Sequence, residues 1–141
     1  MALSIGEVAQ QYDLSIPTLR YYEEQGLLPF IKRSPVGRRE FRQADLDCLC
    51  DIECLKKTGM QLKDIKQYID WRTAGDETLD QRLALIQQRR QMLASEIESL
   101  QAELTKLDHK EWYYTKASEA GTEAIFTADC DTEYERAHQN K

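Results

Sequence analysis

Several features are scarce in this sequence, and each scarcity excludes a class of protein. No apolar run reaches the roughly 18 residues that a membrane-spanning helix needs. With 6 glycines, 3 prolines, 31% charged and 41% hydrophobic residues, the composition is that of a soluble, mostly helical protein rather than a disordered one. The first residues, MALSIGEVAQ, lack the basic segment and apolar stretch of a secretory signal, so we expect a protein that stays in the cytosol.

Side chains that carry catalysis or bind metals are also sparse and scattered. The cysteines, Cys48, Cys50, Cys54 and Cys130, are unevenly grouped, unlike a disulfide scaffold, and we expect them to be reduced. The two histidines lie far apart, and we find neither a nucleophile motif nor a glycine-rich phosphate loop. We therefore expect no enzyme activity, no cofactor and no metal site made of a closed thiolate set.

An excess of positive charge is absent too, since the net charge is −6. Residues 1–72 hold 11 Lys and Arg against 11 Asp and Glu, whereas residues 73–141 hold 8 against 14. A net acidic chain argues against a nucleic-acid partner unless its cations are concentrated in one place. They are concentrated in the segment 20–42, which carries Arg20, Lys32, Arg33, Arg38, Arg39 and Arg42.

The N-terminal pattern predicts two short helices joined by a tight turn. Ser4 and Glu7 have the spacing of a capping box, and apolar residues behind them recur at helical intervals over residues 5–11. Ser15 is a good N-cap for a second helix, which we expect to end at Gly26. Two such helices form a helix-turn-helix.

The next segments predict a hairpin and two further helices. Residues 28–41 contain extended stretches around the turn-forming sequence Ser-Pro-Val-Gly, which predicts a small hairpin with basic residues at its tip. A helix that is apolar over much of its circumference follows and is closed by Gly59. A fourth helix should stop near Gly75.

A long run without proline or glycine lies between Gly75 and Gly121 and predicts one helix of about 40 residues. Its apolar positions alternate spacings of four and three, which is a heptad seam with a single polar interruption at Arg90. The seam consists of Leu79, Leu83, Ile86, Arg90, Leu93, Ile97, Leu100, Leu104 and Leu107.

One seam of this length needs a partner helix, and another copy of the chain is the simplest partner, so we expect a homodimer. The alternative is a long helix packed on its own small domain, which is too short to cover it. We expect the polar, acidic tail after Gly121 to be loosely ordered.

The second helix carries the side chains best suited to contact nucleic acid. Ile16 and Leu19 define its buried side, so the opposite face carries hydroxyl, aromatic and guanidinium groups that suit entry into a DNA groove. The alternative is a solvated helix with surface aromatics, which a neighbouring basic hairpin disfavours. On that outer face we place Pro17, Thr18 and Tyr21, flanked by Arg20 and Tyr22.

A resemblance to a known family lies in three segments, which are IGEVAQQYDLSIPTLRYYEEQGLLP, GRREFRQADL and LKKTGMQLKDI. In this order and spacing they resemble the DNA-binding domain of the MerR-family transcriptional regulators. The resemblance implies a mostly α fold, with a winged helix-turn-helix over residues 1–72, a coiled-coil dimerisation helix over 76–117 and a polar tail over 118–141. An architectural or excisionase-like DNA binder would share the winged domain but lack the long seam.

The resemblance also implies what the protein does. Members form homodimers held by an antiparallel coiled coil, bind double-stranded promoter DNA in the bacterial nucleoid, and bend and untwist it so that RNA polymerase can engage. One departure is Gln61, where the family usually has a better helix cap. Carried over by motif and position, the expected DNA-binding residues are Ser15, Pro17, Thr18, Arg20, Tyr21 and Tyr22 at the recognition helix, Arg38 and Arg39 on the wing, and Lys57 at a phosphate-contacting position.

The signal that such a regulator senses is suggested by Cys54. The segment ECLKKTGM resembles the thiol-reactive branch of the family, whose members respond to aldehydes, nitrosative stress or hypochlorite. Lys56 and Lys57 could stabilise the thiolate of Cys54, which is the reactive form. The alternatives are that Cys54 is a small core residue, and that the regulator responds to a metal ion or a small ligand near the C-terminal end of the coiled coil.

Overall fold

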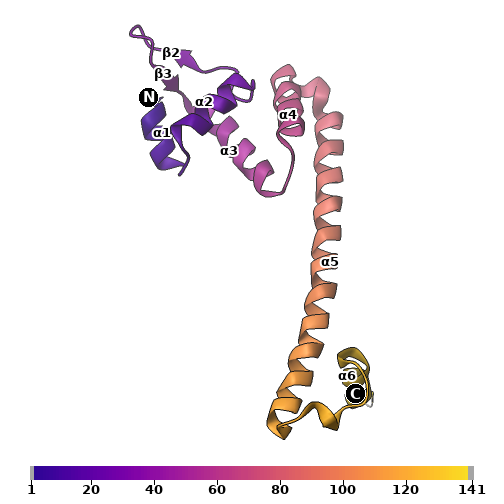
Figure 1. Cartoon of the computed structure of the whole chain (residues 1–141). Helices are drawn as coiled ribbons and strands as arrows, with labels where there is room; N and C mark the ends of the chain where they lie inside the picture. Colours follow the sequence, from indigo (N-terminus) through magenta and orange to yellow (C-terminus); the bar gives the residue numbers. More distant parts are fainter. Residues whose placement is uncertain (1, 140–141) are drawn as a thin grey trace. The chain divides into compact units, whose positions relative to one another are not determined.

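A computed structural model describes residues 2–139 of the chain (Figure 1). The described residues fall into two units, one that ends at Arg90 and one that begins at Gln91. The long helix α5, Leu79–Ala120, contributes its first turns to the first unit and the rest to the second. The architecture is mostly helical, as the sequence predicted.

The first unit begins with the predicted helix-turn-helix. Strand β1 (Leu3–Ser4) leads into α1 (Ile5–Gln11), and the Ser4 hydroxyl accepts a hydrogen bond from the Glu7 amide at 3.1 Å while the Glu7 carboxylate accepts one from the Ser4 amide. These bonds lower the pKa of Glu7 because they favour its charged form. A turn containing Asp13 at φ +54° connects α1 to α2 (Ile16–Glu24).

The wing is a small antiparallel sheet with the strand order β1-β3-β2. Strand β2 (Lys32–Arg33) pairs with β3 (Arg39–Phe41), which also pairs with β1 through Leu3 and Phe41. The sequence predicted the hairpin but not β1, because a two-residue strand has no periodicity to detect. Its pairing ties the start of the chain to the wing.

Two more helices complete the core of this unit. Helices α3 (Gln43–Lys57) and α4 (Leu62–Ala74) enclose apolar side chains together with the helix-turn-helix. Gln61 stands at the N-cap of α4 and makes no side-chain capping bond there, in keeping with the weak cap expected from its sequence. The core residues with no exposed surface are Val8, Leu19, Leu27, Phe41, Leu49, Ile52 and Ile65.

Two arginines on the first turns of α5 bind the ends of the neighbouring helices. After the short 3-10 turn η1 (Asp76–Thr78), Arg82 donates from Nη2 to the Gly75 carbonyl oxygen at 3.0 Å. Two turns further along α5, Arg89 donates from Nε to the Thr58 carbonyl oxygen at 2.8 Å. Because these carbonyls lie at the ends of α4 and α3, the first turns of α5 belong with the first unit.

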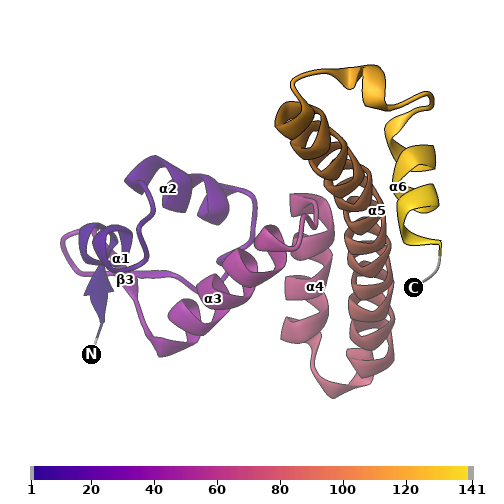
Figure 2. The ribbon, with the colours of Figure 1, turned by 90° about the horizontal axis from the view of Figure 1, so that it is seen from below.

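In the second unit the tail is ordered, which corrects the expectation of a loose tail. After α5 the chain forms η2 (Glu123–Ile125) and α6 (Cys130–His138), and Figure 2 shows α6 alongside α5. Tyr134 of α6 stacks on His109 of α5 with ring centroids 4.1 Å apart, and Trp112 meets Tyr134 edge to face at 5.6 Å. The tail is polar in composition, so these few aromatic contacts could not be anticipated from the sequence. They hold α6 to α5. The last two residues of the predicted tail, 140–141, lie outside the described residues.

Within residues 2–139, no helix is long and apolar enough to cross a membrane. Among those residues there is likewise no group of three or more His, Cys, Asp or Glu side chains that could hold a metal ion.

Replacing Gly59 by alanine should lower the free energy of unfolding by more than the same change at Gly37. Both glycines have a left-handed φ, +87° and +83°, so alanine costs about 1–2 kcal/mol at either site. Only at Gly59 would the new Cβ approach Arg89 Nη2 to 2.7 Å, whereas it meets nothing within 4 Å at Gly37. Displacing the guanidinium from Thr58 should add about 1 kcal/mol. Urea unfolding measures both losses, and equal losses would contradict an anchoring role for Arg89.

Candidate nucleic-acid interface

The start of α2 is fixed by hydroxyl groups that the sequence assigned to DNA binding. The Ser15 hydroxyl caps the helix by accepting from the Thr18 amide at 3.2 Å, and the two hydroxyl oxygens lie 2.7 Å apart. Pro17 follows in the first turn, where its missing N–H leaves no hydrogen bond unmade, and its side chain is exposed. Ser15, Pro17 and Thr18 therefore stand together at the N-terminal end of the recognition helix.

The outer face of α2 carries the predicted aromatic and cationic side chains. Leu19 is fully buried, whereas Arg20 is exposed and Tyr21 keeps 46% of its surface. A half-exposed tyrosine beside an arginine offers a hydroxyl and a guanidinium to phosphate or base edges. This face has the chemistry that the sequence predicted for groove entry.

Tyr22 does not belong to that face, and its assignment as a DNA contact is wrong. Its side chain is 1% exposed, and its hydroxyl donates to Glu53 Oε1 at 2.8 Å and accepts from Lys56 Nζ at 2.9 Å. Burial raises the pKa of Tyr22, and the hydrogen bond to the tyrosine raises the pKa of Lys56. Tyr22 follows Leu19 by three residues, which places both on the buried side of α2. Tyr22 thus joins the recognition helix to α3.

The wing presents exposed cations at and near its tip. Its turn is closed by the Ser34 amide donating to the Arg38 carbonyl oxygen at 2.7 Å and by Arg33 donating to the Gly37 carbonyl oxygen at 2.9 Å. Arg38 is exposed at this tip, as predicted, and so is Lys32 on β2. Lys32 and Arg33 were not among the predicted site residues, although their positions in a basic hairpin would have indicated them.

Arg39 links the wing to the recognition helix. Its Nε donates to Glu23 Oε1 at 2.6 Å, and the two side chains are only 18% and 22% exposed. A partly buried charge-assisted bond of this kind fixes geometry more firmly than a surface pair. Glu23 was missed from the sequence because its partner is 16 residues away. A phosphate contact through the other guanidinium N–H groups of Arg39 stays a prediction.

Lys57 lies at the end of α3 beside the turn between α1 and α2. It lines a hollow with Tyr12 and Leu14, and Leu14 immediately precedes the Ser15 cap of the recognition helix. Its side chain is exposed. The structure therefore places Lys57 beside the turn that precedes α2, and its contact with a phosphate stays a prediction.

Cys54 is exposed and lines the same hollow, together with the exposed Cys50. A solvent-facing sulfur is not a core residue, which removes that alternative. An adduct on this exposed cysteine has room and would not overfill the packed interior. Lys56 does not face it as expected, because its ammonium donates to Tyr22.

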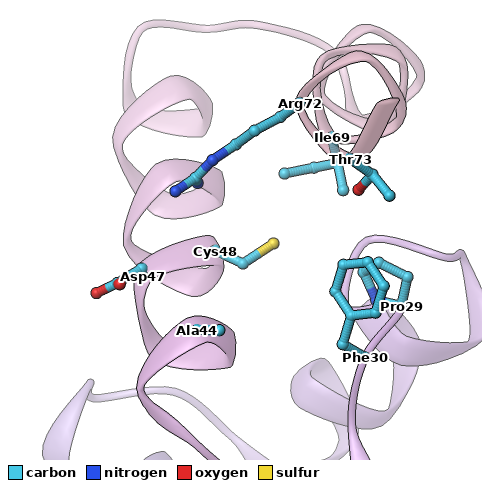
Figure 3. A pocket seen from close by; sticks show the side chains of 8 residues that line it. All are labelled: Pro29, Phe30, Ala44, Asp47, Cys48, Ile69, Arg72 and Thr73. Atoms are coloured by element: carbon cyan, nitrogen blue, oxygen red, sulfur yellow. The ribbon is translucent and has the colours of Figure 1, made fainter. Parts of the chain in front are cut away.

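Cys48 has a different environment, shown in Figure 3. Its sulfur points into an apolar hollow between α3, α4 and the turn at Pro29 and Phe30, and it donates to the Leu27 carbonyl oxygen at 3.2 Å. Burial raises the pKa of the Cys48 thiol to about 11. The thiol therefore stays protonated at neutral pH, and Cys48 is a poor nucleophile.

Comparison with known proteins decides the family. The model for the MerR HTH family regulatory proteins matches residues 3–70, and the model described as MerR, DNA binding matches residues 50–110. An HTH-type transcriptional regulator of Haemophilus influenzae, itself uncharacterised, is 36% identical over 122 residues, which span 86% of this chain and 90% of that protein. The chain belongs to the MerR family. It is a DNA-binding transcriptional regulator rather than an enzyme.

Solved MerR structures share the fold. One is HiNmlR, a MerR family regulator that lacks the sensor domain and was crystallised with promoter DNA, at 35% identity and a TM-score of 0.74 over 89% of this chain and 100% of that one. Another is a MerR-family transcriptional regulator from Bacillus thuringiensis, at 41% identity and a TM-score of 0.68 over 78% of this chain and 96% of that one.

Replacing Arg38 by alanine should weaken binding to all DNA sequences about equally. The loss of one phosphate contact should cost roughly 1 kcal/mol and reduce the slope of log K against log salt by about 1. Replacing Arg20 should cost roughly 1–3 kcal/mol and change the sequence preference. Fluorescence anisotropy on specific and random duplexes separates the two effects. Arg136→Ala in α6 is the matched control, and losses no larger than its own would refute the assigned face.

Proposed function

We propose that the protein binds promoter DNA as a homodimer, with α2 in the major groove and the wing on the phosphate backbone. The observation that carries this proposal is the joining of the exposed α2 face to the cationic wing through Glu23 and Arg39 at 2.6 Å. That bond supports the two surfaces acting as one unit. The promoter DNA bound to HiNmlR lends support from a relative.

The exposed seam of α5 supports dimerisation through an antiparallel coiled coil. Leu83 is 55% exposed, Ile97 61% and Leu100 69%, although all three are strongly apolar. Burying such a side chain is worth on the order of 1–3 kcal/mol, so a continuous stripe of them favours association. A second copy offers a stripe of the same length and spacing.

The dimer would act on the promoter by changing its shape. Two recognition helices held at a fixed separation can bend and untwist the DNA between them, at an energetic cost that the protein contacts offset. RNA polymerase would then meet the two promoter elements in a productive alignment. The polymerase is thus a partner through the shared DNA.

The signal is proposed to be a reactive electrophile that modifies Cys54. Addition of the thiol across an aldehyde carbonyl forms a hemithioacetal, with the thiol proton transferred to the carbonyl oxygen and nothing released. Glu53, which accepts a hydrogen bond from the Tyr22 hydroxyl, lines the same hollow as Cys54. An adduct that moves the Glu53 side chain would alter the support of the recognition helix.

A second candidate is a small ligand bound near the C-terminal end of α5. A shallow hollow there is lined by Trp112 and Phe126, by Lys116, and by Arg136 with its ion-pair partner Glu133. Aromatic walls beside the lysine suit an apolar molecule that carries an acidic group. The same position would be a regulatory site if Cys54 proved inert.

Replacing both Leu93 and Leu100 by aspartate should give a monomer that no longer binds its operator. Two buried carboxylates per helix would cost several kcal/mol in a paired seam. Ser95→Asp with Ala102→Asp is the matched control, because both positions lie on the opposite face of the helix. Sedimentation equilibrium measures the oligomeric state. The proposal fails if the wild-type chain sediments as a monomer at micromolar concentration.

Replacing Cys54 by serine should preserve DNA binding but abolish the transcriptional response to aldehydes and diamide. Cys50→Ser is the matched control, because Cys50 shares the hollow and the exposure of Cys54. Transcription in vitro from the region upstream of its own gene gives the readout, and mass spectrometry identifies the modified sulfur. A normal response in Cys54→Ser would exclude Cys54 as the sensor and favour the α5 end.

A further inference from the structure

One edge of α5 carries four charged residues at intervals of seven, directly beside the apolar seam. They are Arg82, Arg89, Glu96 and Glu103. A spacing of seven keeps side chains on the same edge of a heptad seam, so the four form one row, here named the charged row. The row is positive in its first half and negative in its second.

The positive half of the charged row anchors the DNA-binding unit. Arg82 donates to the Gly75 carbonyl oxygen at 3.0 Å and to the Thr78 hydroxyl at 3.2 Å, and Arg89 donates to the Thr58 carbonyl oxygen at 2.8 Å. Gly59 leaves the space that Arg89 occupies, since a Cβ there would lie 2.7 Å from its Nη2. The ends of α4 and α3 are thus both bound by this row.

When two copies of α5 run antiparallel, the apolar residues of one seam can be paired with those of the other. Each a position of one helix then packs against a d position of the other, and in one such register residues whose numbers add to 183 lie opposite one another, with the twofold axis between Gln91 and Met92. The facing pairs are Leu79 with Leu104, Leu83 with Leu100, Ile86 with Ile97, and Arg90 with Leu93. In a parallel pair, by contrast, Arg90 would face its own copy inside the seam, which places like charges together.

The same register makes the charged row complementary to itself. Equivalent edges meet in an antiparallel pair, so Arg89 faces Glu96 of the partner subunit and Arg82 faces Glu103 of the partner subunit. In a parallel pair this row would face the opposite edge, where Glu103 meets Asp108 and no attractive pair forms. The charge order therefore favours the antiparallel arrangement.

We infer that each arginine of the charged row makes two contacts at once. It binds the end of a helix in its own DNA-binding unit, and it binds a glutamate of the partner subunit. This inference rests on the proposed homodimer and names the residues that complete it. A guanidinium carries five N–H donors in a planar fork, which is enough to bind a carbonyl oxygen and a carboxylate at the same time. The partner's carboxylates thereby help to fix the orientation of the winged unit on α5.

The experiment is a charge-swap pairing of two full-length variants. One carries Glu96→Arg with Glu103→Arg, and the other carries Arg82→Glu with Arg89→Glu. Each alone places like charges together across the dimer, so its dimer Kd should rise at least tenfold. Mixed, the two should form a heterodimer in preference to either homodimer, because every facing pair is then attractive. Differently tagged chains and native mass spectrometry count the species.

A milder variant guards against loss of folding in the arginine variants. Glu96→Gln leaves both arginine anchors intact and should raise the dimer Kd about two- to thirtyfold, with a weaker dependence on salt. Glu98→Gln, two residues away and off the charged row, is the matched control and should leave the dimer Kd unchanged.

The outcomes separate this inference from the proposed homodimer. A wild-type chain that is monomeric overturns both. A wild-type dimer whose swapped variants show no heterodimer preference, and whose Glu96→Gln and Glu98→Gln forms behave alike, overturns only the shared role of the charged row.

Discussion

The apolar stripe on α5 is the constraint on which the rest of the structure depends. Water-exposed leucines and isoleucines along most of a 42-residue helix are unfavourable in a single chain, and most of the stripe is uncovered within each unit. A second copy can cover it. In the proposed dimer, pairing would hold two recognition helices at a set distance, which the proposed change in promoter shape requires.

Polar contacts connect α5 to the helices and the wing of the DNA-binding unit. Arg82 and Arg89 hold the ends of α4 and α3, Tyr22 joins α3 to the recognition helix, and the bond between Glu23 and Arg39 joins that helix to the wing. Each link is a hydrogen bond with a charged partner, and such bonds are directional. A movement of α5 can therefore be transmitted through these hydrogen bonds to the recognition helix and the wing.

Local signals in the sequence predicted most of the fold, because caps, glycines and apolar periodicity act over a few residues. Ser4, Ser15 and Gly59 marked helix boundaries correctly, and the exposed Arg20 and Tyr21 followed from helical rotation. Contacts between residues far apart in the sequence could not be predicted from such local signals. Tyr22 was placed on the surface because its partner Glu53 lies 31 residues away, and the order of α6 was missed because few aromatic contacts produce it.

In the proposed assembly, two chains act together on one DNA site. This stoichiometry can be measured by sedimentation velocity of the protein with a fluorescent duplex from the region upstream of its own gene, at protein concentrations spanning the binding transition. We expect a single shifted boundary with the mass of two chains per duplex and no species with one chain. A stable complex of one chain per duplex, with sequence specificity intact, would contradict the proposed assembly.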